Sequence, residues 1–269
     1  MTSTTETRSG EFHCPGGGSL RYATAGDGVP VVLIHGFSLD HSMWEPQWPV
    51  LRRYRAVRFD LRGYGESTPP AGPYAHVDDV AALLAFLQAG PAHVVGMSMG
   101  GRVALQFALE RPRAVRSLTL VDSVLDGYRM SDAWVRHWRA VVAVAEAGDL
   151  ARAKRLWLEH DLFAPARART DVAPALEAMV ARYSGWHWSH ADPGRAPARP
   201  ASELLATVSV PTLVVVGEFD LPDFQAIARC VVAEVPRATL KVIAGAGHLV
   251  NLEAADEFNE ALLGHLDAA

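Results

Sequence analysis

The sequence has little cysteine and no long apolar run, and each absence excludes a class of protein. Only two cysteines, Cys14 and Cys230, occur among 269 residues, so neither a disulfide framework nor a CxxC pair is present. No segment approaches the roughly 18 consecutive apolar residues of a membrane span. The opening residues 1–12 are polar and lack the apolar stretch of a leader peptide. We therefore expect a cytoplasmic protein with no membrane partner.

Positive charge is also scarce. The chain carries 25 Lys and Arg against 30 Asp and Glu, a formal net charge of -5, and has no dense basic run. This excludes the electrostatic footprint of a nucleic-acid-binding or anionic-lipid-binding protein. We therefore expect its partner to be a small-molecule substrate. Because 49% of the residues are hydrophobic and 20% are charged, the balance is that of a globular protein.

Apolar, β-branched runs alternate with segments of helical spacing. Unbroken runs of this kind are typical of strands buried on both faces of a parallel sheet. Residues 77–90 and 253–266 carry apolar residues at helical spacing, and residues 11–28 read as an antiparallel edge hairpin around a glycine turn. We predict an α/β fold with a mostly parallel central sheet flanked by helices. The predicted strands lie within residues 29–36, 54–60, 92–97, 115–122, 210–218 and 238–245.

The alternation stops after residue 124 and resumes at residue 210. We therefore expect a core formed by residues 1–123 and 202–269, interrupted by a helical cap insertion at residues 124–201 that ends in a Pro- and Gly-containing linker. The insertion contains five of the seven tryptophans, which predict either an aromatic pocket wall or a packed helical layer. These five are Trp134, Trp138, Trp157, Trp186 and Trp188.

Ser98 is the first candidate for chemistry. It is the centre of Gly96-Met97-Ser98-Met99-Gly100, a G-x-S-x-G pentapeptide between a predicted strand and a predicted helix. In that context the serine occupies a sharp, strained turn that exposes its hydroxyl as a nucleophile. The alternative is a serine that merely caps a helix.

A serine nucleophile needs a base, and the base needs an acid to orient it. His248 lies on a glycine-rich loop after the last predicted strand and is the candidate base. Asp220, after the strand ending at residue 218, is the leading candidate acid, with Asp223 and Asp122 as alternatives. The order Ser98, Asp220, His248 is the order of the triad in α/β-hydrolases.

A tetrahedral intermediate also needs N–H donors for its oxyanion. We predict that the first is the Met99 N–H, directly after the nucleophile. The second is expected in the loop after residues 29–36, at Phe37, with Ser38 as the neighbouring alternative. His35 in this loop is expected to fix the loop's shape by hydrogen bonding.

Four blocks together resemble the α/β-hydrolase superfamily of serine hydrolases with a helical cap. They are HGF at residues 35–37, DLRGYGES at 60–67, GMSMGG at 96–101, and the GEFD and GAGHLVNLE segments near the C-terminus. Among these enzymes the chain is similar to 3-oxoadipate enol-lactonases and neighbouring esterases. The resemblance implies hydrolysis of a small carboxylic ester or lactone through an acyl-enzyme on Ser98, with no metal and no organic cofactor.

Two other functions stay open at this stage. Carbon-carbon bond hydrolases of diketone ring-cleavage products share the serine, and a ligand-binding receptor can be built on the same fold. The aromatic insertion predicts an apolar pocket for compact acyl groups. A carboxylate clamp made by Arg129, Arg136 and Arg139 is the alternative for an acidic substrate, although arginines at such helical positions are usually solvated.

Overall fold

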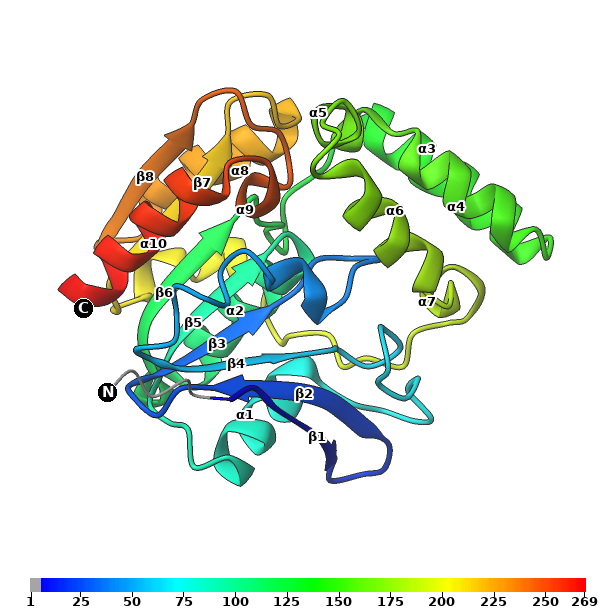
Figure 1. The fold of residues 1–269 in the computed structure, drawn as a ribbon. Helices are drawn as coiled ribbons and strands as arrows, with labels where there is room; N and C mark the ends of the chain where they lie inside the picture. Colours follow the sequence, from blue (N-terminus) through cyan, green and yellow to red (C-terminus); the bar gives the residue numbers. More distant parts are fainter. Residues whose placement is uncertain (1–5) are drawn as a thin grey trace.

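A computed structural model describes residues 6–269 of the chain, and its centre is an eight-stranded sheet (Figure 1). The strand order is β1-β2-β4-β3-β5-β6-β7-β8. Strands β3 to β8 run parallel, whereas β2 pairs antiparallel with both β1 and β4. The predicted edge hairpin and parallel core are both confirmed. The strands are β1 Arg8–His13, β2 Ser19–Ala25, β3 Pro30–Ile34, β4 Arg55–Phe59, β5 Ala92–Met97, β6 Val115–Val121, β7 Thr212–Gly217 and β8 Ala238–Ile243.

The central strands are buried along nearly their whole length. Every residue of β5 and β7 is buried, and β3 and β6 each have a single less buried position near their start. Helices on both faces explain why these strands are uniformly apolar rather than alternating. Since the strands are parallel, the loops that follow them gather at one edge of the sheet, where ligands bind in open α/β sheets.

Helices cover both faces of this sheet. Helices α1 His76–Phe86, α2 Met99–Glu110 and α8 Pro222–Glu234 lie on one face, and α9 Val250–Glu253 and α10 Ala255–Ala268 lie on the other (Figure 1). A short 3-10 helix, η1 His41–Trp44, accompanies α9 and α10. Buried amides join these segments, because Gln47 Nε2 donates to the Asn251 carbonyl at 2.9 Å and to Asn259 Oδ1 at 3.0 Å.

The segment between β6 and β7 is helical, as its sequence predicts. The apolar pattern of residues 132–163 is broken in the structure at Gly148, whose φ of 88° ends one helix and starts a turn. The linker at residues 191–200 contains no helix, in agreement with its composition. The insertion helices are α3 Asp132–Glu146, α4 Leu150–Leu158, α5 Ala164–Arg167, α6 Ala173–Arg182 and α7 Trp186–Ser189. Four more 3-10 turns are η2 Pro112–Ala114, η3 Asp161–Phe163, η4 Ala201–Glu203 and η5 Leu205–Thr207.

These insertion helices lie beyond the carboxyl ends of the central strands (Figure 1). Polar contacts fasten them to the core, and two of these contacts reach the loop after β3. Arg182 Nη2 of α6 pairs with Asp40 Oδ2 at 2.7 Å, and the Trp157 indole N–H of α4 donates to Ser38 Oγ at 2.7 Å. Within residues 6–269, no helix combines the length and the apolar character that a membrane crossing requires.

Candidate active site

Ser98 occupies a strained turn between β5 and α2. Its backbone has φ 52° and ψ -114°, and its side chain makes no capping hydrogen bond to the helix that follows. A Cβ on Gly96 would collide with the Gly100 carbonyl oxygen, and one on Gly100 would collide with the Ile34 carbonyl oxygen. The turn is therefore tight enough to require glycine on both sides of the serine. A helix-capping serine does not need this strain, so the simple capping interpretation is wrong.

Asp220 and His248 are paired at the same edge of the sheet. His248 Nδ1 lies 2.9 Å from Asp220 Oδ2, and both side chains are almost completely buried. Asp220 Oδ1 also accepts the Leu221 N–H at 2.7 Å, which fixes the carboxylate plane. Because Asp220 follows β7 and His248 follows β8, two neighbouring parallel strands deliver the pair to one place.

The two alternative acids lie in different surroundings. Asp223 is in the first turn of α8 and accepts the Ser131 N–H at 3.0 Å and the Ser131 hydroxyl at 2.6 Å, at the start of α3. Asp122 follows β6 and is buried beside Asp220, with Oδ1 accepting the Gly217 N–H at 2.9 Å. Burial and the neighbouring Asp220 raise the pKa of Asp122 well above its ordinary range, which favours the protonated form of this carboxyl group.

Glu253 supports the loop of His248, a role that was not predicted from the sequence. Its buried carboxylate accepts the Gly247 N–H at 2.6 Å and the Leu249 N–H at 2.9 Å, the two amides on either side of His248. Glu253 therefore holds the loop that presents the imidazole. Its position at the end of the GAGHLVNLE block was the available signal.

The loop after β3 approaches the Ser98 turn. In the described part of the chain, the Phe37 N–H makes no hydrogen bond, and Met99 is the first residue of α2, whose N–H has no acceptor within the helix. The Ser38 side chain is used differently, because its Oγ accepts the Trp157 indole N–H. Phe37 and Met99 both line the cavity that contains Ser98.

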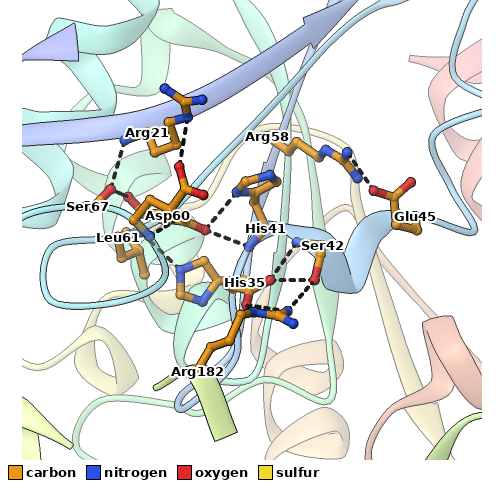
Figure 2. Close-up of polar contacts among 12 residues, drawn as sticks. Arg21, His35, His41, Ser42, Glu45, Arg58, Asp60, Leu61, Ser67 and Arg182 are labelled. Atoms are coloured by element: carbon orange, nitrogen blue, oxygen red, sulfur yellow. Dashed lines mark hydrogen bonds and ion pairs between the residues drawn. The ribbon is translucent and has the colours of Figure 1, made fainter. Parts of the chain in front are cut away.

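His35 shapes this loop and makes no contact with Asp220 or His248. Its Nε2 accepts the Leu61 N–H at 3.0 Å, so the ring proton is on Nδ1, which donates to the Gly36 carbonyl at 2.8 Å. Nearby, Asp60 Oδ1 accepts both the backbone N–H and the ring N–H of His41, and Figure 2 shows these contacts converging on the loop. The network joins the HGF and DLRGYGES blocks into one rigid support.

We expect Asp60→Asn to destabilise the fold by about 1 to 3 kcal/mol at pH 7. Burial alone would raise the pKa of Asp60, but the hydrogen bond and charge of His41 outweigh it and hold the pKa below its ordinary value. A lowered pKa means that the stabilisation is present at neutral pH and is lost as the pH falls through and below the ordinary carboxyl pKa of about 4. Urea unfolding at several pH values measures both effects.

The matched control for this measurement is Asp78→Asn, because Asp78 is exposed and pairs with Arg111 at the surface. We expect this substitution to lower the free energy of unfolding by less than about 1 kcal/mol. Equal stability of the wild type and Asp60→Asn at pH 7 would contradict the supporting role of Asp60.

A cavity of about 450 Å³ lies between the sheet edge and the insertion. Ser98, Met99 and His248 form part of its floor, and the remaining wall is mainly apolar and aromatic. Three of the five insertion tryptophans line it, whereas Trp188 is buried in the packing of the insertion and Trp186 is stacked on His190. The principal aromatic wall residues are Phe37, Tyr64, Trp134, Trp138, Trp157 and Phe163.

The alternative of an arginine clamp is wrong, and the three arginines are solvated as their helical positions predict. Arg129, Arg136 and Arg139 are exposed, and none of them lines the cavity, because their positions on and before α3 face solvent. Arg102 of α2 lines the cavity instead, one helical turn after Ser98.

Asp122, Asp220 and His248 also satisfy the geometry of a metal site, since one ligand atom from each lies within 4.8 Å of the others. The Asp220–His248 hydrogen bond occupies the nitrogen that such an ion would need. This cluster therefore fits proton transfer better than ion binding.

The family of the chain follows from comparison with known proteins. Residues 29–255 match the model of the alpha/beta hydrolase fold family. The chain belongs to the α/β-hydrolase family. It is an esterase-like hydrolase, in agreement with the resemblance found in its sequence.

Several relatives of this hydrolase are known. It is 34% identical to the dihydrolipoyllysine-residue acetyltransferase component of the acetoin cleaving system of Cupriavidus necator, over 92% of the chain but only 66% of that relative's length. It is 32% identical to the pimeloyl-[acyl-carrier protein] methyl ester esterase of Xanthomonas campestris, over 88% of the chain and 94% of the relative. It is 27% identical to 3-oxoadipate enol-lactonase 1 of Acinetobacter baylyi, over 87% of the chain and 87% of the relative.

A solved structure of a related esterase has the same fold. The thermophilic esterase of Thermogutta terrifontis matches the hydrolase with a TM-score of 0.82 at 27% identity, over 97% of this chain and 98% of that chain.

Proposed function

We propose that the hydrolase cleaves a small carboxylic ester or lactone through an acyl-enzyme on Ser98. The observation that carries this proposal is that Ser98, on its strained turn, and His248, hydrogen-bonded to Asp220, line the same cavity. The names of the esterase and lactonase relatives are consistent with it.

In the proposed reaction, Ser98 Oγ attacks the ester carbonyl while His248 takes the hydroxyl proton. Asp220 keeps the His248 proton on Nδ1 and stabilises the imidazolium that forms. The Phe37 and Met99 N–H groups donate to the oxyanion of the tetrahedral intermediate.

The collapse of this intermediate breaks the C–O bond, and His248 protonates the departing alcohol or enol. A water molecule, deprotonated by His248, then attacks the acyl-enzyme. The second tetrahedral intermediate collapses as His248 returns the proton to Ser98 Oγ, and the acid is released. The aromatic wall favours compact apolar acyl groups, since it offers apolar surface close to the serine.

Turnover of p-nitrophenyl esters and small lactones tests this function. We expect measurable kcat/KM for short-chain esters, with a pre-steady-state burst when deacylation is slower than acylation. Binding without turnover would favour a receptor, and cleavage of a diketone with no cleavage of any ester would favour a carbon-carbon bond hydrolase.

A further inference from the structure

The loop after β3 makes a sharp turn beside the nucleophile. The Leu39 N–H donates to the Gly36 carbonyl at 3.4 Å, which closes a four-residue turn with Phe37 and Ser38 at its centre. Ser38, the third residue of this turn, has a φ of 60°, where glycine or asparagine is the usual choice. A serine with such a φ carries strain of about 1 to 3 kcal/mol and persists only where its surroundings hold it in place.

A contact that holds Ser38 comes from the insertion rather than from the core. The Trp157 indole N–H donates to Ser38 Oγ at 2.7 Å, and both side chains are buried. Within residues 6–269, this indole is the one hydrogen-bond partner of the Ser38 hydroxyl. Breaking the contact would leave a buried donor and a buried acceptor unpaired, so we expect the folded enzyme to keep it.

Phe37 is contacted from the same side. Its ring packs edge-on against three aromatic rings of the insertion, with centroid distances of 5.0 Å to Trp138, 5.5 Å to Tyr183 and 5.7 Å to Trp157. Its backbone N–H, in contrast, makes no hydrogen bond in the described chain, and the residue lines the cavity that contains Ser98. The insertion therefore fixes the side chain of Phe37 and leaves its N–H available as a donor.

A second tie between the insertion and this loop is weaker. Arg182 of α6 donates to Asp40 Oδ2 from Nε at 3.0 Å and from Nη2 at 2.7 Å, while Asp40 Oδ1 accepts the Ser42 N–H at 2.9 Å (Figure 2). The Arg182 side chain is 52% exposed, so solvent screens this ion pair. The buried contact of Trp157 with Ser38 is therefore the main polar link.

We propose that Trp157 is a positioning residue of the oxyanion hole: its hydrogen bond to Ser38 holds the turn in the conformation that directs the Phe37 N–H to the oxyanion. This inference rests on the proposed hydrolysis at Ser98 and adds that the insertion completes the catalytic site as well as enclosing the substrate. Loss of the contact should weaken binding of the tetrahedral intermediates of acylation and deacylation far more than binding of the uncharged ester.

Two variants remove the two partners of this hydrogen bond separately. Trp157→Phe keeps an aromatic ring in the cavity wall, and Ser38→Ala leaves the wall intact because Ser38 does not line the cavity. We expect each variant to lower kcat for p-nitrophenyl butyrate by about 10- to 100-fold, with KM within a few-fold of the wild type. The double variant should be little worse than either single variant, since both changes remove the same contact.

Trp188→Phe is the matched control. The Trp188 ring is buried, and its centroid lies 6.0 Å from that of Phe37. Its indole N–H has no hydrogen-bond partner within the described residues, however, and it does not line the cavity. We expect kcat of this variant to stay within a few-fold of the wild type, and a loss as large as that in Trp157→Phe would overturn the inference. Melting temperatures show whether each variant is folded.

A pair of inhibitors separates positioning from packing. With a butyl trifluoromethyl ketone, Ser98 Oγ adds to the carbonyl carbon, the hydroxyl proton passes to His248, and the carbonyl oxygen becomes the oxyanion. Butyl methyl ketone is far less electrophilic and measures binding without this addition. We expect Trp157→Phe and Ser38→Ala to raise the Ki of the fluorinated ketone by about 10- to 100-fold and to leave that of the methyl ketone within a few-fold.

The outcomes distinguish this inference from the proposed function. An active wild type whose kcat survives in Ser38→Ala, or equal losses of affinity for the two ketones, would overturn the role of Trp157 alone. A wild type that hydrolyses no ester and binds the fluorinated ketone no more tightly than the methyl ketone would overturn the proposed function, and the role of Trp157 with it.

Discussion

Ser98→Ala is expected to lower kcat/KM for ester hydrolysis by about 10⁴- to 10⁶-fold. The change removes the hydroxyl that would form the acyl-enzyme and retains the Cβ, so the backbone at φ 52° keeps the same local sterics. Because the hydroxyl makes no capping hydrogen bond, its loss should leave the melting temperature nearly unchanged. Steady-state kinetics and thermal unfolding of the purified variant measure the two effects.

Ser123→Ala is the matched control for Ser98→Ala. Ser123 is also a buried serine after a central strand, but its hydroxyl donates to the Val124 carbonyl and it does not line the cavity. We expect its activity to stay within a few-fold of the wild type, at a cost of about 1 kcal/mol in stability. Full activity in Ser98→Ala would show that Ser98 is not the nucleophile.

Asp220→Asn should lower kcat by about 10⁴-fold. The amide at position 220 favours the wrong tautomer of His248 and does not stabilise the imidazolium, although the shape of the side chain is kept. Asp122→Asn provides the comparison, since the raised pKa of Asp122 favours a neutral side chain at this position and an amide oxygen can still accept the Gly217 N–H.

We therefore expect Asp122→Asn to stay within about 10-fold of the wild type, because its effect is limited to one neutral hydrogen-bonding group. If Asp122→Asn lowered kcat as much as Asp220→Asn does, Asp220 could not be assigned as the acid ahead of Asp122. The comparison uses kcat for a single neutral ester at pH 7 and the melting temperature of each variant.

The sequence was sufficient for the sheet and for the positions of the main site residues, because both depend on local patterns. The β-branched runs reveal strands buried on both faces, and residues that directly follow such strands must lie at one edge of a parallel sheet. Ser98, Asp220 and His248 each follow a strand in this way. They lie together at the carboxyl edge because the strands are parallel, and no knowledge of which distant residues touch is needed to predict this.

The choice among the three acids could not be made from the sequence. Asp220 and Asp223 are three residues apart, but Asp220 precedes α8 and faces His248, whereas Asp223 lies in the helix and faces Ser131. Asp122 is close to Asp220 only because β6 and β7 are neighbours in the sheet. Such differences depend on strand order and side-chain direction, which apolar periodicity does not encode.

The wall of the cavity was predicted only in part. The tryptophan content of the insertion indicated an aromatic wall, but which of its residues face the cavity depends on how α3, α4 and α7 pack against the sheet. The arginines of α3 face solvent, and the cavity arginine, Arg102, belongs to the helix that begins after Ser98. Its spacing of one helical turn from Ser98 was a readable signal, since residues four apart share a helix face.

Covalent labelling tests the central claim most directly. The hydrolase is incubated with a serine-directed fluorophosphonate, and the adduct is measured by intact mass and located by peptide mass spectrometry. Activated Ser98 predicts one adduct per chain, on the peptide that contains residue 98, with no adduct in Ser98→Ala and much slower labelling in Asp220→Asn. An adduct on a different serine, or an active enzyme that remains unlabelled at Ser98, would contradict the account.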